Sequence, residues 1–432
     1  MGNVVHIAGI GGVGMSALAQ TLLDQGRTVT GSDRLLDHGD LTSTLSRLKA
    51  QGVRLFPQDG SGIGRDTARL VVSSAIESDN PDKLKAETLG IPVVHRADEL
   101  AAALSGRTLV AVAGTCGKSS VTAMLGHLLV AAGFDPLVVN GAEVGGWDDN
   151  GRRIGSVHFG TGKWAVAEVD ESDKSLMAFS PDHAIITNAS ADHFGMDETQ
   201  ELFSSFRAKI PGVVIDGRSE TGLPQDVELS GWAGSFTLDG TRYTVPMPGM
   251  HNVMNSWHAV RMALALGADP HTLQAALPEF KGISRRLQRV GQCDGAMVVD
   301  DYAHNPEKLA AAWKTLSAVA PNGICAVWRP HGYAPLRKML NALTDMFAEV
   351  CRPQDRLILL PVYDAGGTAN RSVCSGDLAE QLHLRGVNVQ LANGMPEAEA
   401  IMRAAANQAG VLATFGARDP DLPRLAQRLA NV

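Results

Sequence analysis

Short runs of apolar, mostly β-branched residues alternate along the whole chain with Ala- and Leu-rich stretches of helical periodicity. This alternation is typical of α/β domains, in which helices connect the strands of largely parallel sheets. Polar–apolar alternation on both sides of Asp239-Gly240 predicts a hairpin over residues 236–245. The other strands are predicted at residues 4–8, 28–30, 70–74, 92–94, 109–113, 137–139, 164–168, 184–187, 296–300, 324–328, 357–361, 387–391 and 411–414.

The 432 residues are too many for one hydrophobic core and indicate several domains. A predicted helix over residues 97–104 and the short link Ser105-Gly106-Arg107 place a first boundary near residue 105. A helix that begins after His251 closes the second part, and the third part begins around Ile283. We therefore expect three α/β domains, over residues 1–105, 106–282 and 283–432.

The composition narrows the class of protein. Hydrophobic residues make up 44% and charged residues 19% of the chain, as in ordinary globular proteins. The net charge of −8, without a block of Lys or Arg, argues against a nucleic-acid partner. The N-terminus has no signal-peptide pattern and no apolar stretch approaches the ~18 residues of a membrane span, so we expect a cytoplasmic protein without membrane insertion. Five scattered cysteines without a C-x-x-C pair predict reduced thiols rather than disulfides or a zinc site.

The segment Gly114-Thr115-Cys116-Gly117-Lys118-Ser119-Ser120 follows a predicted strand and opens a predicted helix. A glycine-rich turn at this place directs backbone N–H groups and the positive end of the helix dipole at one small volume, which suits a polyphosphate. Lys118 is then expected beside the β- and γ-phosphates of ATP, and the Ser119 hydroxyl on Mg²⁺. Val112 stands where the common phosphate-loop pattern has its first glycine, so the match is to a shorter variant.

A second glycine-rich turn runs from Gly9 to Gly14, between the first predicted strand and a helix that starts at Met15. Asp33, about 20 residues later, completes a dinucleotide-binding fingerprint. A nicotinamide-dependent oxidoreductase or a nucleotide-binding regulator is therefore an alternative. The same turn serves any diphosphate, however, and nothing in the sequence supplies a site for hydride transfer.

Acidic residues follow the strand predicted at 164–168, in the order Glu168-Val169-Asp170-Glu171-Ser172-Asp173. Asn188 follows the next strand, and Asp192-His193 lies just beyond it. Strand ends of this kind line the crevice in which α/β sheets bind ligands. We therefore expect Glu168 and His193 to share a Mg²⁺ ion with Ser119.

The order of these motifs resembles that of the Mur ligases over nearly the whole chain, and most closely that of their UDP-N-acetylmuramate:L-alanine ligase branch. The motifs that carry the resemblance are Gly9 to Ser16, Gly31-Ser32-Asp33, Ser73 to Ile76, His95-Arg96-Ala97, Gly114 to Ser120, Glu168 to Asp173, Thr187-Asn188, Asp192-His193, His251-Asn252-Val253-Met254-Asn255, Arg285-Arg286, Asp300 to Pro306 and Pro330-His331.

The resemblance implies a three-domain α/β fold, with Rossmann-like N- and C-terminal domains and a central P-loop ATPase-like domain with a parallel or mixed sheet. It implies an ATP-dependent ligase in which the carboxylate of a UDP-N-acetylmuramate-like acid takes the γ-phosphoryl group of ATP. A small amino acid or peptide, with L-alanine foremost, then displaces phosphate from the acyl phosphate. The enzyme is expected to be a monomer or a homodimer that closes about links near residues 105 and 282 when it binds ATP.

The resemblance also implies the roles of individual residues. Lys118, Glu168, His193 and His331 are the expected catalytic residues, and one or two Mg²⁺ ions are held by Ser119, Glu168 and His193. ATP is expected to contact residues 114–120 and Asn252, Asn255, Arg286, Asp301 and His304. The acid is expected on Gly11, Gly12, Val13, Gly14 and Met15, with Asp33 and Ser74 at its uridine end.

The chain departs from the family pattern at several positions. Cys116 and Ser119 stand where histidine and threonine are usual, and the stretch between Asp216 and Pro246 is short. Gly332 and Pro335 replace arginines of the loop that receives the amino acid's carboxylate, and Arg337 remains nearby. Because guanidinium groups pair with carboxylates, this change opens alternatives for the acceptor. They are another amino acid, a tripeptide as in the related recycling ligase, or a carboxylate–amine pair outside cell-wall synthesis.

Overall fold

The structure is a computed structural model that describes residues 3–37, 39, 41–190, 195–218, 222–364, 370–417 and 419–431. The chain forms two compact units. The first unit comprises Met1–Glu228, Ser235–Pro246 and Met250–Lys281, and the second comprises Leu229–Gly234, Met247–Gly249 and Gly282–Val432. The boundary expected near residue 105 lies inside the first unit, so the division into three domains stays a prediction. Among the described residues, no helix combines the length and the apolar character needed to cross a membrane.

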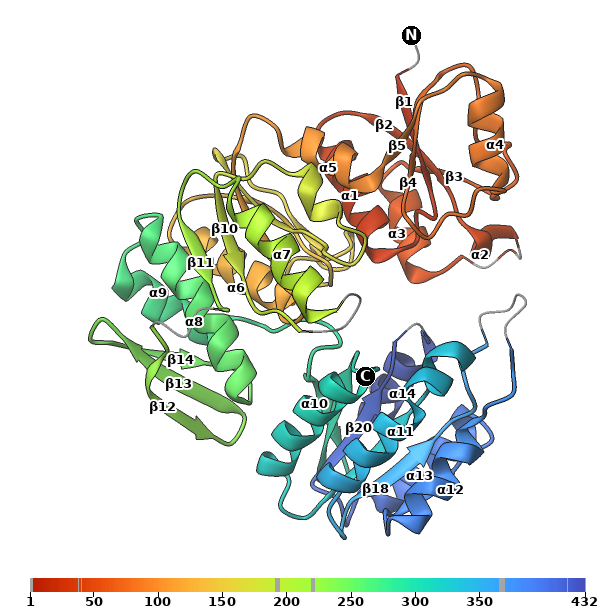
Figure 1. Cartoon of the computed structure of the whole chain (residues 1–432), viewed down its shortest axis with the longest axis vertical. Coiled ribbons are helices and arrows are strands. Elements are labelled where there is room, and N and C mark those ends of the chain that lie inside the picture. The colour runs from red at the N-terminus through yellow and green to blue at the C-terminus, as the bar shows by residue number, and fades with distance from the viewer. Residues whose placement is uncertain are drawn as a thin grey trace. The chain divides into compact units, whose positions relative to one another are not determined.

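The first sheet has the strand order β3-β2-β1-β4-β5, and all its strand pairs are parallel (Figure 1). Its strands are β1 (Val4–Ala8), β2 (Thr28–Ser32), β3 (Arg54–Phe56), β4 (Thr67–Val72) and β5 (Val93–His95). The helices are α1 (Val13–Asp24), α2 (Arg34–Asp37), α3 (Ser43–Ala50), α4 (Pro81–Thr88) and α5 (Arg96–Leu104). Leucines of α1, α3 and α5 pack on one face of the sheet, and Ala86 of α4 packs on the other.

The second sheet has the order β11-β10-β6-β9-β7-β8, with β8 antiparallel to β7 and the other pairs parallel. Its strands are β6 (Thr108–Ala113), β7 (Leu137–Val139), β8 (Val157–His158), β9 (Trp164–Glu168), β10 (His183–Ile186) and β11 (Val214–Asp216). Around it lie α6 (Lys118–Ala131), α7 (Met196–Arg207), α8 (Met250–Ala265), α9 (Pro270–Ala276) and the short 3-10 helices η1 (Ser175–Ala178) and η2 (Leu277–Glu279).

The two sheets of the first unit share one hydrophobic core, which includes residues of α1, α5, β6, β9 and β10. Buried Gln20 of α1 ties the sheets together, because its Oε1 accepts a hydrogen bond of 3.0 Å from the N–H of Ile154. Since β6, β9 and β10 run parallel, their carboxyl ends lie at one edge of the second sheet. The expected phosphate loop, the acidic segment and Thr187-Asn188 follow these three strand ends.

A small sheet follows, in the order β12 (Gln225–Ser230), β13 (Ala233–Leu238) and β14 (Thr241–Val245). Asp239 and Gly240 connect β13 to β14 with φ angles of 49° and 77°. Two positive φ angles are what a two-residue hairpin turn requires. The predicted hairpin is therefore confirmed.

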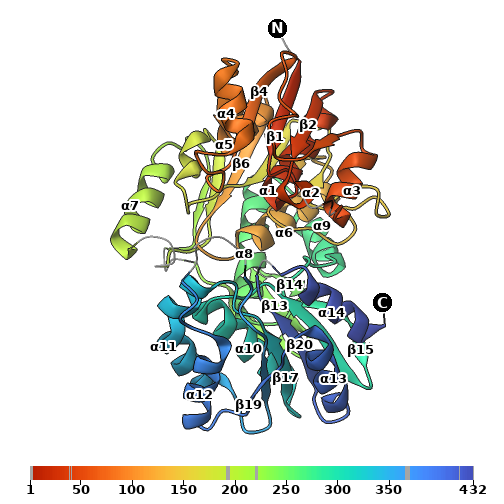
Figure 2. The same cartoon turned by 90° about the vertical axis from the view of Figure 1, so that its right-hand side faces the viewer.

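The second unit contains the sheet β15-β16-β20-β17-β18-β19, in which only β15 is antiparallel to its neighbour among the described pairs (Figure 2). Its strands are β15 (Gln288–Cys293), β16 (Ala296–Asp301), β17 (Ile324–Trp328), β18 (Arg356–Leu359), β19 (Val389–Leu391) and β20 (Val411–Phe415). Helices α10 (Pro306–Val319), α11 (Tyr333–Val350) and α12 (Ser375–Leu384) cover one face, and α13 (Met395–Ala405) and α14 (Asp421–Ala430) cover the other. The predicted α/β class is confirmed.

Candidate active site

The phosphate loop connects the end of β6 to the start of α6. Gly114 and Gly117 have φ angles of 134° and 84°, which L-residues with side chains rarely adopt. Gly117 is the N-cap of α6, and no side chain of the described residues caps this helix end. The first N–H groups of an α-helix have no partner within the helix. The start of α6 can therefore donate hydrogen bonds to an anion.

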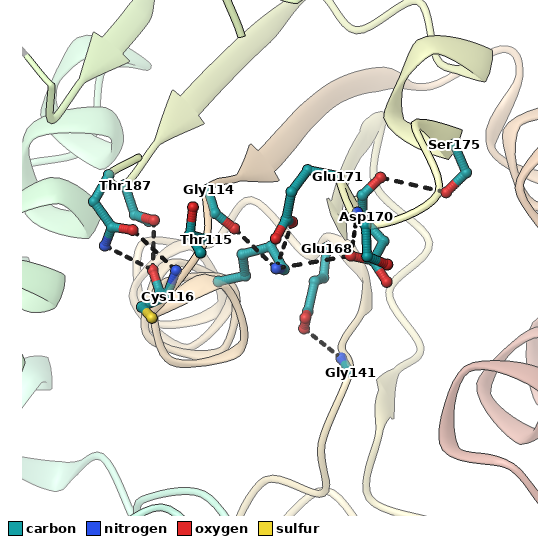
Figure 3. A network of polar contacts seen from close by, with 12 residues as sticks. Gly114, Thr115, Cys116, Gly141, Glu168, Asp170, Glu171, Ser175 and Thr187 are labelled. Carbon is teal, nitrogen blue, oxygen red and sulfur yellow. Dashed lines mark hydrogen bonds and ion pairs between the residues drawn. The ribbon is translucent and has the colours of Figure 1, made fainter. Parts of the chain in front are cut away.

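Residues after β10 hold this loop in place (Figure 3). The Thr187 hydroxyl donates to the carbonyl of Cys116 over 2.6 Å, and the Asn188 Nδ2 donates to the same oxygen over 3.0 Å. The Cys116 N–H in turn donates to Asn188 Oδ1 over 2.9 Å. A methyl group added to Gly114 would lie 2.0 Å from Thr187 Oγ1, so only glycine fits this approach. The loop is thus fixed before any nucleotide binds.

Lys118 is the first residue of α6, and its ammonium group turns back over the loop. Its Nζ donates to the Gly114 carbonyl over 2.8 Å and to Glu171 Oε2 over 2.7 Å. Burial alone would lower the pKa of Lys118, but the negative charges of Glu171, Asp170 and Glu168 raise it above its ordinary value. Lys118 is therefore charged at neutral pH and lies where a polyphosphate on this loop would meet it.

Glu168, the last residue of β9, points toward the loop that follows β7 (Figure 3). Its Oε2 accepts a hydrogen bond of 2.7 Å from the N–H of Gly141. Ser119, in the first turn of α6, is buried. Asp192 and His193 lie outside the described residues, so the expected metal trio of Ser119, Glu168 and His193 stays a prediction. Within the described ranges, no three His, Cys, Asp or Glu side chains form a group that could hold a metal ion.

The oxygen groups present nevertheless fit Mg²⁺. Glu171 and Asp170 form ion pairs with Lys118 over 2.7 and 3.8 Å, and the charge of Glu168 also raises the pKa of Lys118. Mg²⁺ prefers oxygen ligands and is usually held by one or two carboxylates together with substrate phosphates. Glu168, at the end of β9, can supply one such ligand.

Helix α8 brings Asn252 and Asn255, both buried, to the phosphate loop. A methyl group added to Gly117 would lie 2.5 Å from Asn255 Oδ1, so the amide contacts the start of α6. Side chains three positions apart lie on the same face of a helix. The two amides can therefore face the same ligand next to the phosphate loop.

A cavity of about 350 Å³ opens beside this site in the first unit. It is lined by the turn of Gly12, Val13, Gly14 and Met15, by Ser73 and Ser74, and by Asn140, Gly141, Glu168, Asp170 and Asp173. Arg96 also lines the cavity, and its Nη1 would lie 3.1 Å from a methyl group on Gly14. No side chain of the described residues caps α1 at Gly12. The cavity lining thus contains a guanidinium group and three carboxylates. Although burial alone would raise the pKa of Asp170, Lys118 and Arg96 help to hold it below its ordinary value.

Asp33 is not part of the cavity lining, but its carboxylate holds the glycine-rich turn. Its Oδ2 accepts from the Gly11 N–H over 2.9 Å, and its Oδ1 accepts from the Leu35 N–H over 3.1 Å. The expected contact of Asp33 with the uridine end of the acid stays a prediction. The contact that the structure provides is with the backbone of the turn.

In the second unit, Asp301 ends β16 and is buried. Its two carboxylate oxygens accept from the N–H groups of Leu287 and Ala303, over 2.6 and 2.7 Å. Burial raises the pKa of Asp301 to about 6, although Arg286 acts in the opposite direction. The guanidinium of Arg286 lies 5.2 Å from the centre of the Tyr302 ring. Asp301 thus orders the segment that carries Arg286.

His304 lies edge-on to His331, with ring centres 4.9 Å apart. Burial lowers the pKa of His304 to about 4, so its imidazole is neutral at pH 7. The His304 Nδ1 lies 2.9 Å from the Tyr302 carbonyl, which can only accept, so Nδ1 carries the proton. His304 Nε2 is then a hydrogen-bond acceptor at the strand ends of this sheet.

Gly332 precedes α11, the helix on which Arg337 lies. Arg337 is exposed, and its Nη1 donates to the Ser372 hydroxyl over 3.3 Å. Two other guanidinium groups nearby are already neutralised, since Arg329 pairs with Asp419 over 2.7 Å and Arg371 with Asp364 over 2.8 Å. Arg337 has no carboxylate partner in the described part of the chain.

Comparison with known proteins identifies the family. Residues 4–108 match the family described as "Mur ligase family, catalytic domain", and residues 285–418 match "Mur ligase, glutamate ligase domain". The UDP-N-acetylmuramate–L-alanine ligase of Methylobacterium radiotolerans is 34% identical over 403 residues, which cover 84% of this chain and 83% of that protein. The chain belongs to the Mur ligase family. A Mur ligase is an ATP-dependent enzyme that forms a C–N bond, so the expected enzyme class is confirmed.

Two further comparisons agree with this assignment. The UDP-N-acetylmuramate–L-alanine ligase of Geobacter sp. (strain M21) is 33% identical over 417 residues, which cover 88% of this chain and 87% of that protein. The crystal structure of the UDP-N-acetylmuramate–alanine ligase of Thermotoga maritima superposes with a TM-score of 0.82 at 24% identity, covering 99% of this chain and 98% of that one. This likeness shows the fold of a three-domain Mur ligase.

The sequence reasoning missed three residues of this Mur ligase site. Arg96 was part of a recognised motif, but its place on the cavity depends on the packing of α5 against α1. The Thr187 hydroxyl that fixes the loop, and the Gly141 N–H that fixes Glu168, come from other strand ends. Only Thr187 and Arg96 had a sequence signal, in the motifs Thr187-Asn188 and His95-Arg96-Ala97.

Proposed function

We propose that this chain joins L-alanine to the carboxylate of UDP-N-acetylmuramate at the expense of ATP, through an acyl phosphate. The observation that carries the proposal is the fixed phosphate loop beside a cavity that is lined by the Gly12 to Met15 turn, Arg96 and three carboxylates. The names of the curated relatives supply the two substrates. Because ATP and UDP-sugars are cytoplasmic metabolites, we infer that the reaction takes place in the cytoplasm.

In this proposal the phosphate loop binds the ATP triphosphate. The N–H groups at the start of α6 donate to its oxygens, and Lys118 neutralises charge that develops on the transferring γ-phosphoryl group. Ser119 and Glu168, together with His193, would hold Mg²⁺, which supplies charge neutralisation between the phosphates when bound. Asn252 and Asn255 are assigned to adenine.

The acid binds in the cavity with its diphosphate against the turn of Gly12 to Gly14, where α1 begins and Arg96 adds a positive charge. Ser74 lines the same cavity and is assigned to the uridine end. The muramate carboxylate then points toward Lys118 and Glu168. The carboxylates of Glu168, Asp170 and Asp173 repel its charge until ATP and Mg²⁺ are present. The reaction is therefore favoured only in the complete complex.

The amine step is assigned to the second unit. Neutral His304 and the neighbouring His331 can hydrogen-bond to the incoming ammonium group or to the ribose. Arg286 is assigned to the phosphates, and Arg337 to the carboxylate of the amino acid. Asp301 positions Arg286 and His304, because its carboxylate holds the backbone N–H groups of the neighbouring Leu287 and Ala303. These roles follow the family resemblance and stay predictions.

The test is a product analysis with ATP, Mg²⁺, UDP-N-acetylmuramate and a pool of the twenty amino acids. We expect one new product, heavier than the acid by one alanine residue, and equal amounts of ADP and phosphate. Omitting the acid or the amine should remove phosphate release, and Lys118→Ala should abolish turnover while the circular dichroism spectrum stays unchanged. A product with another amino acid would overturn the assignment of L-alanine, and no product with any amine or with the tripeptide would overturn the ligase assignment for this acid.

A further inference from the structure

We infer that Glu171 is a positioning residue that holds the Lys118 ammonium group in the nucleotide-free loop and must release it when ATP binds. Glu171 Oε2 lies 2.7 Å from Lys118 Nζ, and the glutamate side chain is only 4% exposed. Asp170 lies farther away, at 3.8 Å, and is 40% exposed. Glu171 therefore makes the stronger of the two contacts. The inference rests on the proposed binding of ATP at this loop.

Hydrogen bonds restrain the segment that carries Glu171, so it cannot easily move with Lys118 when the lysine turns to a ligand. The Lys174 N–H donates to the Glu171 carbonyl over 2.9 Å, and the Leu176 N–H donates to the Asp170 carbonyl over the same distance. Side-chain bonds tighten the turn, because the Ser172 and Ser175 N–H groups donate to Asp170 and Asp173. Ser175 Oγ also donates to the Asp170 carbonyl (Figure 3). The backbone that carries the Glu171 side chain is thus held in place at the end of β9.

An ammonium group has three donors, and two of them are directed at Gly114 and Glu171 in this structure. A lysine that reaches both the β- and the γ-phosphate needs two donors, so phosphate oxygens beside the loop compete for the donor that Glu171 holds. Once the lysine turns to them, a buried carboxylate is left without its partner next to a polyanion. Removing one partner of a buried ion pair is costly, so the pair opposes nucleotide binding. We expect Glu171 to lower the affinity of the loop for ATP.

The experiment measures binding of a non-hydrolysable ATP analogue with Mg²⁺ by calorimetry, with no acid or amine present. Glu171→Gln should bind the analogue about tenfold more tightly than the native chain, the equivalent of one charge-assisted hydrogen bond. Glu171→Asp, which keeps the charge on a shorter side chain, should give an intermediate affinity. The matched control is Glu198→Gln, because Glu198 also pairs with a lysine, Lys174, over 2.7 Å but is 49% exposed. Its affinity should equal that of the native chain.

A second set of variants, made in a chain that carries Lys118→Ala, distinguishes the effect of the ion pair from repulsion between the Glu171 charge and the nucleotide. In Lys118→Ala the carboxylate has no lysine to hold, so adding Glu171→Gln should tighten binding clearly less than it does in the native chain. An unchanged or weaker affinity of Glu171→Gln, or an equal gain in both backgrounds, would overturn the inference. If the native chain itself failed to bind the analogue, the assignment of ATP to the loop would fail instead.

Discussion

Replacing Gly114 with alanine tests whether the phosphate loop is fixed as described. The added methyl group would lie 2.0 Å from Thr187 Oγ1, 3.0 Å from the Thr187 nitrogen and 3.1 Å from the Asn188 nitrogen. The hydroxyl can rotate away, but the two backbone nitrogens cannot, because the Thr187 N–H is bonded to the Ala113 carbonyl over 2.9 Å. The loop itself has to move, and the Thr187–Cys116 hydrogen bond is then lost.

The structure sets the size of the effect. A non-glycine residue at a φ of 134° costs about 1–3 kcal/mol of the free energy of unfolding, and the lost hydrogen bond adds about 1 kcal/mol. The total is about 2–4 kcal/mol, and because 1 kcal/mol lowers Tm by about 2–4 °C for a domain of this size, Gly114→Ala should lower the Tm by roughly 4–16 °C. Gly133→Ala is the matched control, since Gly133 has a φ of 78° but no atom within 4 Å of the added methyl group. It should lower the Tm by only about 2–4 °C, the cost of backbone strain near 1 kcal/mol.

Differential scanning fluorimetry with and without a Mg²⁺–ATP analogue measures both properties. A ligand at one hundred times its Kd stabilises the folded state by about 2.7 kcal/mol. The native chain and Gly133→Ala should show this rise in Tm, and Gly114→Ala should show none. A Gly114→Ala variant that kept the full rise in Tm would refute the reasoning, because the loop would then bind nucleotide without the geometry that only glycine permits.

Three further predictions concern the cavity, the metal ligand and the second unit. Arg96→Gln should raise the KM for UDP-N-acetylmuramate about tenfold, the cost of one charge-assisted hydrogen bond to phosphate, and leave the KM for ATP unchanged in a phosphate-release assay. Gly141→Ala places a methyl group 2.4 Å from Glu168 Oε2, so the Mg²⁺ concentration for half-maximal activity should rise. The raised pKa of Asp301, about 6, means that the folded state holds this proton more tightly than the unfolded chain. The urea midpoint of the second unit, followed by tryptophan fluorescence, should therefore fall as pH rises from about 4 to 6, and Asp301→Asn should flatten this slope.

The inner strands of the three larger sheets were predictable because they are apolar on both faces. Residues 4–8, 137–139, 164–168 and 324–328 were predicted with the bounds that the structure has. The strands that the sequence did not reveal lie at sheet edges, as β3, β8, β11, β12 and β15 do. An edge strand needs little apolar surface, and β12, which reads Gln-Asp-Val-Glu-Leu-Ser, is mostly exposed. Val227 and Leu229 alternate with polar residues in it, but two apolar residues alone are a weak strand signal.

The candidate site also has features that the sequence predicts and features that only the fold shows. The phosphate loop was predictable because one short segment carries the glycines, the lysine and the helix start. The hydrogen bonds that fix the loop come from Thr187 and Asn188, about 70 positions away in the sequence. The sequence around the loop does not reveal where these side chains lie. Asp33 illustrates the limit. The sequence indicates an acid after β2, but only the fold shows that its carboxylate holds the N–H of Gly11 rather than lining the cavity.

We predict from charge balance that the loop before α11 can bind the amino acid without the arginines that the resemblance implies at positions 332 and 335. A carboxylate needs a cation that is not already neutralised, and both Arg329 and Arg371 are paired with aspartates. Arg337 makes only a hydroxyl contact, with Ser372, among the described residues, and a hydroxyl does not cancel its charge. The same loop therefore keeps one unneutralised guanidinium group near the start of α11. In the proposed reaction, this guanidinium group is available to the carboxylate of the amino acid.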